Sequence, residues 1–337
     1  MLTSRELVYK TLNFQNPYRA PRQLWVLPWA EIHYPEHLKK IKEDFPDDII
    51  GAPGFYKEPV KVNGNPYEPG IYIDEWNCKF INVQRGIIGE VKEPIVQGEN
   101  WEDDYKIRIP VEYLKIDKDR INEFCHNTDK FVLAGVTPNI FERLQYIRGT
   151  QQLLIDLVFR PHGMFRVIRK IHDFYCEVLS EWAKTDVDAL TFMDDWGTQS
   201  SLLVNPKVWV EIFKPLYKDY IEIAHRHGKK IFMHSDGYIL DIIPHLIELG
   251  LDAINSQIFC MGVEKLRQFR GKITFWGEID RQYLLARGSV EEIEEAVKKV
   301  KENLWINGGC IAQCEFGIGA KPENVYKVFE TWNKITA

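Results

Sequence analysis

Short apolar runs alternate with amphipathic helical segments along the chain after residue 130. Apolar runs of strand length predict strands, which lie at residues 131–136, 188–195, 229–234, 251–256, 272–278 and 308–314. Between them apolar residues recur at helical spacing, which predicts helices over residues 150–158, 161–184, 206–227, 238–249 and 290–304. This alternation predicts an α/β fold in which helices cover a parallel sheet.

The first third of the chain has a different pattern. A helix is expected over residues 3–12, and the run RQLWVLPW, residues 22–29, is expected to contain a strand. Residues 55–95 are rich in Pro and Gly and contain short β-like runs, which predict an inserted β-hairpin or meander. No linker or low-complexity segment divides the sequence, so we expect one domain over residues 1–337.

Four of the later predicted strands end on polar side chains. The end residues are Asp194 and Asp195, His234 and Asp236, Asn255 and Gln257, and Glu278 and Asp280. In a (β/α)8 barrel the carboxyl ends of the strands meet at one mouth, where active sites form. An open doubly wound sheet is not supported, because no Gly-rich phosphate-binding turn follows an early strand. We therefore predict a (β/α)8 TIM-type barrel.

Composition narrows the classes of function. A net charge of −6 without a sustained basic patch argues against nucleic acid as a partner. No apolar run approaches the ~20 residues of a membrane-spanning helix, and the N-terminus lacks the apolar core of a signal peptide. We therefore expect a cytoplasmic protein with no membrane partner. The six cysteines are scattered along a large chain, which predicts free thiols.

Residues 234–237 end an apolar run on polar side chains. In an extended segment residues i and i+2 point to the same side, so His234 and Asp236 can face one metal ion or one substrate. The alternative is that Asp236 caps a helix beginning near Tyr238. His234 closes the strand and is the stronger candidate for the pocket.

Adjacent carboxylates at Asp194 and Asp195 close another predicted strand. Neighbouring strand residues point to opposite sides, so one is expected to face the mouth while the other anchors a loop or helix. Partly desolvated acids can have raised pKa values and serve in proton transfer, which makes both candidate catalytic residues. The alternative is a simple turn at DDWG. Trp196, Gln199 and Gln257 lie close to predicted strand ends and are candidate substrate contacts.

The last predicted strand carries Cys310 and Cys314, and the strand before it ends at Glu278. The even spacing lets both thiols face one side, and a thiolate at Cys314 together with His234 would suit zinc. Cys310 is more simply explained by packing in the barrel wall. Glu278 is a further candidate substrate contact, and the alternative for it is a salt bridge to Arg281.

Three long stretches resemble the uroporphyrinogen decarboxylase superfamily, most closely its branch related to cobalamin-dependent methyltransferases. They are TFMDDWGTQSSLLVNPKVWVEIFKPLYKDYIEIAHRHGKKIFMHSDGYILDIIPHLIELGLDAIN, WGEIDRQYLLARGSVEEIEEAVKKV and GGCIAQCEFGIGAKPENVYKVFETW. The resemblance covers most of the chain, is clearest from about residue 130 to 335, and is more specific for the superfamily than for a reaction. It implies a uroporphyrinogen decarboxylase-like barrel with its site at the mouth.

The resemblance implies one of two chemistries. Methyltransferases of this branch hold zinc with a His-x-Cys pair and a distant Cys. In this chain His234 matches the His, Asp236 replaces the first Cys, and Cys314 falls near the distal Cys. Aspartate is an accepted zinc ligand, and the exchange suits an oxygen-linked methyl donor such as a methyl ether. Uroporphyrinogen decarboxylases instead carry an early arginine-rich motif for the substrate carboxylates, and here only Arg19 and Arg22 occupy that region.

From this resemblance we expect a zinc-dependent methyltransferase that moves a methyl group between a small substrate and a corrinoid. The expected metal ligands are His234, Asp236 and Cys314. No segment resembles a cobalamin-binding domain with its Asp-x-His-x-x-Gly loop, so the corrinoid is expected on a partner protein. The alternatives are a metal-independent decarboxylase of uroporphyrinogen or another carboxylated substrate, and a non-catalytic corrinoid- or substrate-binding protein.

Overall fold

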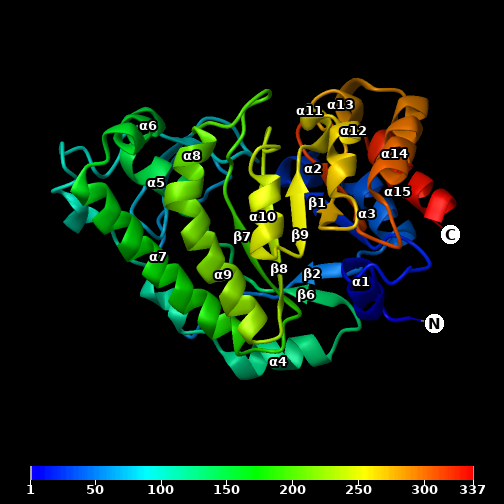
Figure 1. Cartoon of the computed structure of the whole chain (residues 1–337), viewed down its shortest axis with the longest axis horizontal. Helices are drawn as coiled ribbons and strands as arrows, with labels where there is room; N and C mark the ends of the chain where they lie inside the picture. Colours follow the sequence, from blue (N-terminus) through cyan, green and yellow to red (C-terminus); the bar gives the residue numbers. More distant parts are fainter. Residues whose placement is uncertain (1, 337) are drawn as a thin grey trace.

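The computed structural model describes residues 2–336 and has an eight-stranded parallel barrel at its centre (Figure 1). Around the barrel the strands are β1 (Arg22–Val26), β2 (Ile49–Gly51), β6 (Phe131–Leu133), β7 (Ala189–Met193), β8 (Lys230–Ser235), β9 (Ala253–Ser256), β10 (Thr274–Trp276) and β11 (Cys310–Phe316). Each strand from β2 onward pairs in parallel with the next, and β11 pairs with β1. The predicted (β/α)8 barrel is confirmed.

The seam between β1 and β2 is closed by two aspartates. The Asp48 N–H donates to the Arg22 carbonyl at 2.8 Å, and the Asp48 carboxylate accepts the Arg22 N–H at 2.8 Å. The Asp47 carboxylate accepts the Leu24 N–H at 2.7 Å. The N–H groups of Arg22 and Leu24 on this edge of β1 therefore have partners, which an open sheet edge would not provide.

Helices cover the outside of the barrel (Figure 1). They are α2 (Pro28–His33), α3 (Pro35–Asp44), α4 (Lys118–His126), α5 (Ile140–Arg148), α6 (Thr150–Phe159), α7 (His162–Ala183), α8 (Pro206–Val208), α9 (Lys214–Arg226), α10 (Ile243–Leu249), α11 (Ile258–Met261), α12 (Val263–Leu266), α13 (Leu284–Arg287), α14 (Val290–Leu304) and α15 (Pro322–Thr336). The 3₁₀ segments η1 (Asp104–Lys106), η2 (Val111–Leu114) and η4 (Arg267–Phe269) and the π-helical η3 (Trp209–Phe213) complete them. No helix within residues 2–336 has both the length and the hydrophobicity to cross a bilayer.

Helix α1 (Ser4–Leu12) closes the N-terminal end of the barrel. Its Val8 and Leu12 pack into the same buried cluster as the inward-facing side chains of the strands. Aromatic rings fill that interior: Phe131 and Phe232 stack with centroids 5.7 Å apart, and Phe232 meets Trp276 edge-on at 5.0 Å. Because the interior is a packed core, the open end formed by the strand carboxyl termini is left for a functional site.

The insertion predicted near residues 55–95 forms a three-stranded antiparallel sheet. Its strands are β3 (Gly70–Ile73), β4 (Lys79–Asn82) and β5 (Glu90–Val91), in that order. In the β3–β4 turn the Asp74 carboxylate accepts the N–H groups of Trp76 at 3.0 Å and Cys78 at 2.7 Å. Asp74 also pairs with Arg143 of α5, which ties the insertion to the helices around the barrel.

Side chains alternate between the barrel interior and the helix layer along each strand. In β11, Ile311 belongs to the interior cluster, whereas Cys310, Ala312, Cys314 and Phe316 belong to the outer core that packs against the helices. This alternation decides which side chains at the strand ends face the mouth.

Candidate metal centre and active site

A connected polar cluster lies at the mouth, where β8, β9 and β11 end. His234 Nδ1 lies 2.6 Å from Asn255 Oδ1. The amide nitrogen of Asn255 donates to the Trp276 carbonyl and, at 3.0 Å, to Gln313 Oε1, so the amide oxygen is the acceptor that faces His234. Nδ1 therefore donates to Asn255, and this leaves Nε2 facing the mouth.

Two carboxylates face that nitrogen. His234 Nε2 lies 3.7 Å from Asp195 Oδ1 and 3.6 Å from Asp236 Oδ1, and ligand atoms of the three residues all lie within 4.8 Å of one another. The Asp236 N–H donates to Asp195 Oδ1 at 2.9 Å, which joins the ends of β7 and β8. Asp236 Oδ1 is buried and has no hydrogen-bond partner among the described residues. This corner of the site therefore holds an excess of acceptors and of negative charge.

The pKa of Asp195 reflects that crowding. Burial and the nearby carboxylates of Asp236 and Glu142 raise the pKa of Asp195 to about 6, although His234 acts in the opposite direction. A carboxylate whose ionised form is disfavoured in this way is stabilised by a cation placed beside it.

Arg281 is the cation of the outer mouth. It pairs with Asp236, with Glu315 (Nη1 to Oε2, 3.0 Å) and with Glu278 (Nε to Oε1, 3.6 Å). Burial lowers the pKa of Arg281, but Glu278, Asp236 and Glu315 together raise it above its usual value. The salt bridge that was the alternative for Glu278 is thus present.

Glu278 nevertheless keeps free acceptor capacity. Its side chain is 3% exposed, and neither carboxylate oxygen has a hydrogen bond within residues 2–336. Burial raises the pKa of Glu278 to about 7, against the effect of Arg281. Near neutral pH the group is therefore able to accept or to donate a proton.

A pocket of about 200 Å³ borders the cluster and is lined by three of the predicted substrate contacts, Gln199, Gln257 and Glu278. Gln257 Oε1 also accepts the Gly237 N–H at 3.2 Å, which links the pocket to the end of β8. Pockets for drug-sized ligands measure roughly 300–1,000 Å³, so this one suits a small substrate. A second hollow of about 550 Å³ shares Arg281 and Gln282 with this pocket.

Asp194 turns away from the mouth. It is fully buried, and its carboxylate accepts the Tyr217 hydroxyl at 2.5 Å and the Glu142 N–H in the first turn of α5 at 2.8 Å. Burial raises the pKa of Asp194 well above its usual value. Of the two adjacent acids, Asp195 faces the mouth and Asp194 anchors a helix, so Asp194 is not placed for the catalytic role that the sequence suggested.

Trp196 also lies away from the pocket. The ring is fully buried, stacks on Phe141 with centroids 4.0 Å apart, and donates from Nε1 to the Tyr217 hydroxyl at 2.8 Å. It packs between β7 and the helix layer because position 196, like position 194, continues the set of alternate positions that point outward from β7. The expected substrate contact is therefore corrected to a core residue.

Cys314 is not brought to His234 and Asp236. The inward positions of β11 are occupied by Gln313 and Glu315, so Cys314 faces the helix layer, where it is fully buried and where burial raises the pKa of its thiol. The even spacing does place Cys310 and Cys314 on one side, but that side is outside the barrel. The third ligand-type residue in the cluster is Asp195. All six cysteines are free.

The helix-capping alternative for Asp236 does not apply. Helix α10 begins at Ile243, and its N-cap residue Ile242 makes no side-chain capping bond. The carboxylate of Asp236 instead lies between His234 and Arg281.

Sequence reasoning missed three residues that build the mouth, Trp25, Gln313 and Glu315. It named Asn255 only as a polar strand end and Arg281 only as an alternative partner of Glu278. Trp25 packs against the His234 ring with centroids 5.2 Å apart. The period of two in the segment CIAQCEF was the available signal, because Gln313 and Glu315 share one side of the strand. Which side faced inward could not be read from the segment itself.

Asp195, His234 and Asp236 fit a divalent transition metal. A metal-ligating histidine usually donates its other ring N–H to a fixed acceptor, as His234 does to Asn255. Imidazole and carboxylate are ligand types that such ions accept, and three protein ligands leave a fourth position open. The buried Asp236 Oδ1 without a partner is the atom that such an ion would satisfy.

The arginines expected near the start of the first strand lie at the opposite end of the barrel. Arg22 begins β1, and both Arg19 and Arg22 pair with Asp48, at 2.6 Å and 3.8 Å. Arg281, at the mouth, is already shared among three carboxylates. None of these three arginines is free to bind a polycarboxylate substrate.

The chain is similar to several known proteins. The sequence matches the family model for uroporphyrinogen decarboxylase (URO-D) over residues 81–335. A methyltransferase from Methanosarcina mazei has a similar structure, with 13% identity, a TM-score of 0.66, and complete coverage of both chains. A 3-keto-D-glucoside 4-epimerase from E. coli, at 11% identity and a TM-score of 0.39, covers 66% of this chain and 86% of its own. A search of curated proteins gave no match.

Proposed function

This chain belongs to the uroporphyrinogen decarboxylase family, and from that premise we propose that it is a zinc-dependent methyltransferase. Asp195, His234 and Asp236 are the proposed zinc ligands, and the methyl group moves between a small substrate and a corrinoid carried by a partner protein. The observation that carries the proposal is the position of His234 Nε2, which faces two carboxylates while Nδ1 is held by Asn255. Without a proton or a metal ion between them, three acceptors would repel one another.

The residues of the mouth would have different roles in such a reaction. Zinc bound there would supply Lewis-acid activation of the atom that carries the methyl group. Asn255 keeps His234 Nε2 directed at the mouth, and Arg281 offsets the charge of the outer carboxylates. Glu278, with its pKa raised to about 7, is the group we assign to give a proton to the demethylated heteroatom.

The donor set favours a hard methyl donor. One nitrogen and two carboxylate oxygens are harder ligands than the thiolates of a His-Cys-Cys site, so the bound ion prefers an oxygen-containing partner. The pocket of about 200 Å³ has room for a small methyl ether. The structural likeness to a methyltransferase supports the same choice of reaction.

Decarboxylation of a porphyrinogen is the less favoured alternative. Such a substrate carries several carboxylates and needs several unpaired cations to bind it. Arg281 is shared among Asp236, Glu278 and Glu315, and Arg19 and Arg22 lie at the far end of the barrel. No observation favours a non-catalytic binding protein over an enzyme.

Metal analysis of anaerobically purified protein tests the ligand set. Wild type, His234→Ala, Asp195→Ala and Cys314→Ala are compared for zinc by elemental analysis, with Cys314→Ala as the control because its thiol lies outside the barrel. We expect His234→Ala and Asp195→Ala each to lose one zinc per chain relative to wild type, and Cys314→Ala to lose none. Unchanged zinc in both of the first two variants would reject the site.

Turnover tests the reaction. Zinc-loaded protein is mixed with cob(I)alamin and a panel of methyl ethers, methylamines and methyl thioethers, and formation of methylcobalamin is followed by absorbance. We expect methyl transfer from an ether, abolished in His234→Ala. Carbon dioxide release from a carboxylated substrate by metal-free protein would instead establish the decarboxylase.

A further inference from the structure

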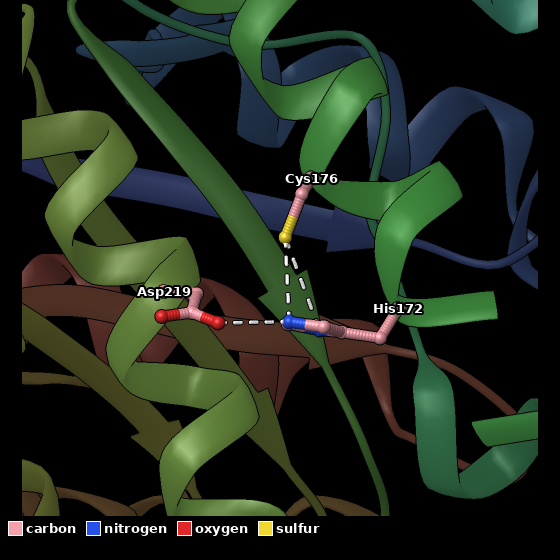
Figure 2. Close-up of side chains that lie close together, drawn as sticks. All are labelled: His172, Cys176 and Asp219. Atoms are coloured by element: carbon pink, nitrogen blue, oxygen red, sulfur yellow. Dashed lines mark hydrogen bonds and ion pairs between the residues drawn. The ribbon is translucent and has the colours of Figure 1, made fainter. Parts of the chain in front are cut away.

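A second group of metal-ligand side chains lies outside the barrel, between α7 and α9 (Figure 2). His172 and Cys176 are one turn apart on α7, and Asp219 faces them from α9. His172 Nε2 lies 2.9 Å from Asp219 Oδ2 and 3.5 Å from Cys176 Sγ. Figure 2 shows the Asp219 carboxylate directed at Nε2 and the Cys176 thiol beside the ring, within reach of both ring nitrogens, with Sγ 3.9 Å from Nδ1.

We propose that His172, Cys176 and Asp219 form a second zinc site, which links α7 to α9 on the outside of the barrel. The site is separate from the mouth and does not depend on the function proposed there. Its donor set of one imidazole, one thiolate and one carboxylate consists of the ligand types that zinc takes in proteins.

The nitrogen–sulfur distance matches tetrahedral coordination, but both partners of His172 have to move for one ion to bind all three side chains. Zn–N and Zn–S bonds of about 2.0 and 2.3 Å at a tetrahedral angle place nitrogen and sulfur about 3.5 Å apart, and the observed separation is 3.5 Å. Cys176 Sγ also lies 3.9 Å from Nδ1, so the thiol lies beside the ring and has to turn toward the Nε2 side to bind the same ion. Two ligand atoms with bonds of about 2.0 Å lie about 3.3 Å apart, so Asp219 has to withdraw slightly from its 2.9 Å contact. The Asp219 side chain is 55% exposed, which leaves it free to move and leaves the fourth position open to water.

The charges around the thiol suit a cation. Burial and then the carboxylates of Asp219, Asp173 and Glu177 raise the pKa of Cys176 to about 12, so without a metal ion the group is a neutral thiol. When zinc binds, the S–H proton passes to solvent and a Zn–S bond forms in its place. The thiolate and Asp219 then supply two negative charges to balance the ion, and His172 binds as a neutral imidazole.

A buried hydroxyl nearby has no partner. Tyr220 follows Asp219 on α9 and is fully buried, with its ring centroid 5.2 Å from that of His172. Across the described chain its hydroxyl makes no hydrogen bond, and burial together with Cys176 raises its pKa. The cluster therefore borders a buried donor that has no partner among residues 2–336.

Cobalt(II) substitution distinguishes this site from the mouth. Protein stripped with a chelator is titrated anaerobically with cobalt(II), and the sulfur-to-cobalt charge-transfer absorption is recorded. Among the two proposed sites only the one at Cys176 contains a thiolate. We expect the band to reach the intensity of one thiolate-bound cobalt per chain in both wild type and His234→Ala, to disappear in Cys176→Ala, and to need at least tenfold more cobalt in His172→Ala.

Cys260→Ala is the matched control, because Cys260 is the other partly exposed thiol and lies beside the mouth. It should keep the band. A band that persists in Cys176→Ala, or cobalt uptake by wild type without any band, overturns the proposal. If Cys176→Ala does not fold, as judged by circular dichroism, Cys176→Ser replaces it with the same expected loss. Loss of one equivalent in His234→Ala with the band intact tests the mouth separately.

Discussion

Replacing Asp194 and Asp195 one at a time by alanine should produce opposite defects, although the two carboxylates are adjacent in the sequence. Asp194→Ala removes a buried acceptor from under α5 and is expected to destabilise the fold. Asp195→Ala removes a partly exposed carboxylate that faces His234 and is expected to abolish metal binding at the mouth with little loss of stability.

The contacts of Asp194 set the size of the effect. Its loss leaves the Tyr217 hydroxyl and the Glu142 N–H without their acceptor, at about 1–3 kcal/mol for each unsatisfied buried group, or about 2–6 kcal/mol together. The alanine variant no longer has to bury a carboxyl group, and this offsets part of the loss. We therefore expect the free energy of unfolding to fall by about 2–4 kcal/mol, in the lower part of that range. With an unfolding entropy of about 0.7 kcal/mol/K for 337 residues, this lowers Tm by about 3–6 °C.

Replacing Asp195 should cost less stability, because its carboxylate makes fewer contacts. It accepts one backbone N–H, from Asp236, and its side chain is 36% exposed. The loss of that hydrogen bond amounts to about 0.5–1.5 kcal/mol, partly offset because repulsion from Asp236 disappears. We expect Tm in the presence of a chelator to fall by about 1–2 °C or less.

Thermal unfolding followed by circular dichroism, in the presence of a chelator, measures both variants without a contribution from bound metal. Zinc content of the folded protein is then measured after reconstitution. Asp194→Asn, which keeps one acceptor oxygen, should lose about half as much stability as Asp194→Ala. The reasoning fails if Asp194→Ala is as stable as wild type, or if Asp195→Ala is the less stable of the two alanine variants.

The contacts of Asn255 and Glu278 at the mouth lead to two further predictions. Asn255→Ala should weaken zinc binding about 10–100-fold in equilibrium dialysis, because His234 loses the acceptor that orients it. Ser256→Ala, the control, removes a buried hydroxyl without a partner and should change zinc binding less than about twofold. Equal losses in the two variants would contradict the role of Asn255. Because the pKa of Glu278 is raised to about 7 in the folded state, its contribution to stability is present at low pH and is lost as pH rises through 7. In chelator-treated protein Glu278→Gln should therefore gain stability relative to wild type between about pH 5 and 8 in urea unfolding, and a pH-independent difference would refute this.

Much of the fold could be predicted because its signals are local. The helical period over residues 290–304 matches α14, and the capping box at Ser289 and Glu292 marks its start. The apolar runs before Asp194 and His234 became β7 and β8. Alternation of strands and helices was enough to predict the barrel, and barrel geometry was enough to place polar strand ends at one mouth.

The sequence also identified two of the three candidate metal ligands as a pair. His234 and Asp236 share one side of an extended segment, and the structure places both at the mouth. The same alternation along a strand correctly predicted that Cys310 and Cys314 share one side of β11, but it did not predict whether that side faces the barrel interior or the helices. A pattern of period two has two equivalent phases, and only packing against the helices selects one of them.

What the sequence could not decide was which residues distant along the chain become neighbours. Asp195 became the partner of His234 because β7 and β8 are adjacent with Met193 opposite His234, a register set by the barrel as a whole. Asp219 meets His172 because α7 and α9 pack together outside it. Backbone periodicity is a property of a few consecutive residues and can be read locally, whereas strand order, register and the inward face follow from burying one continuous core, which depends on the entire chain at once.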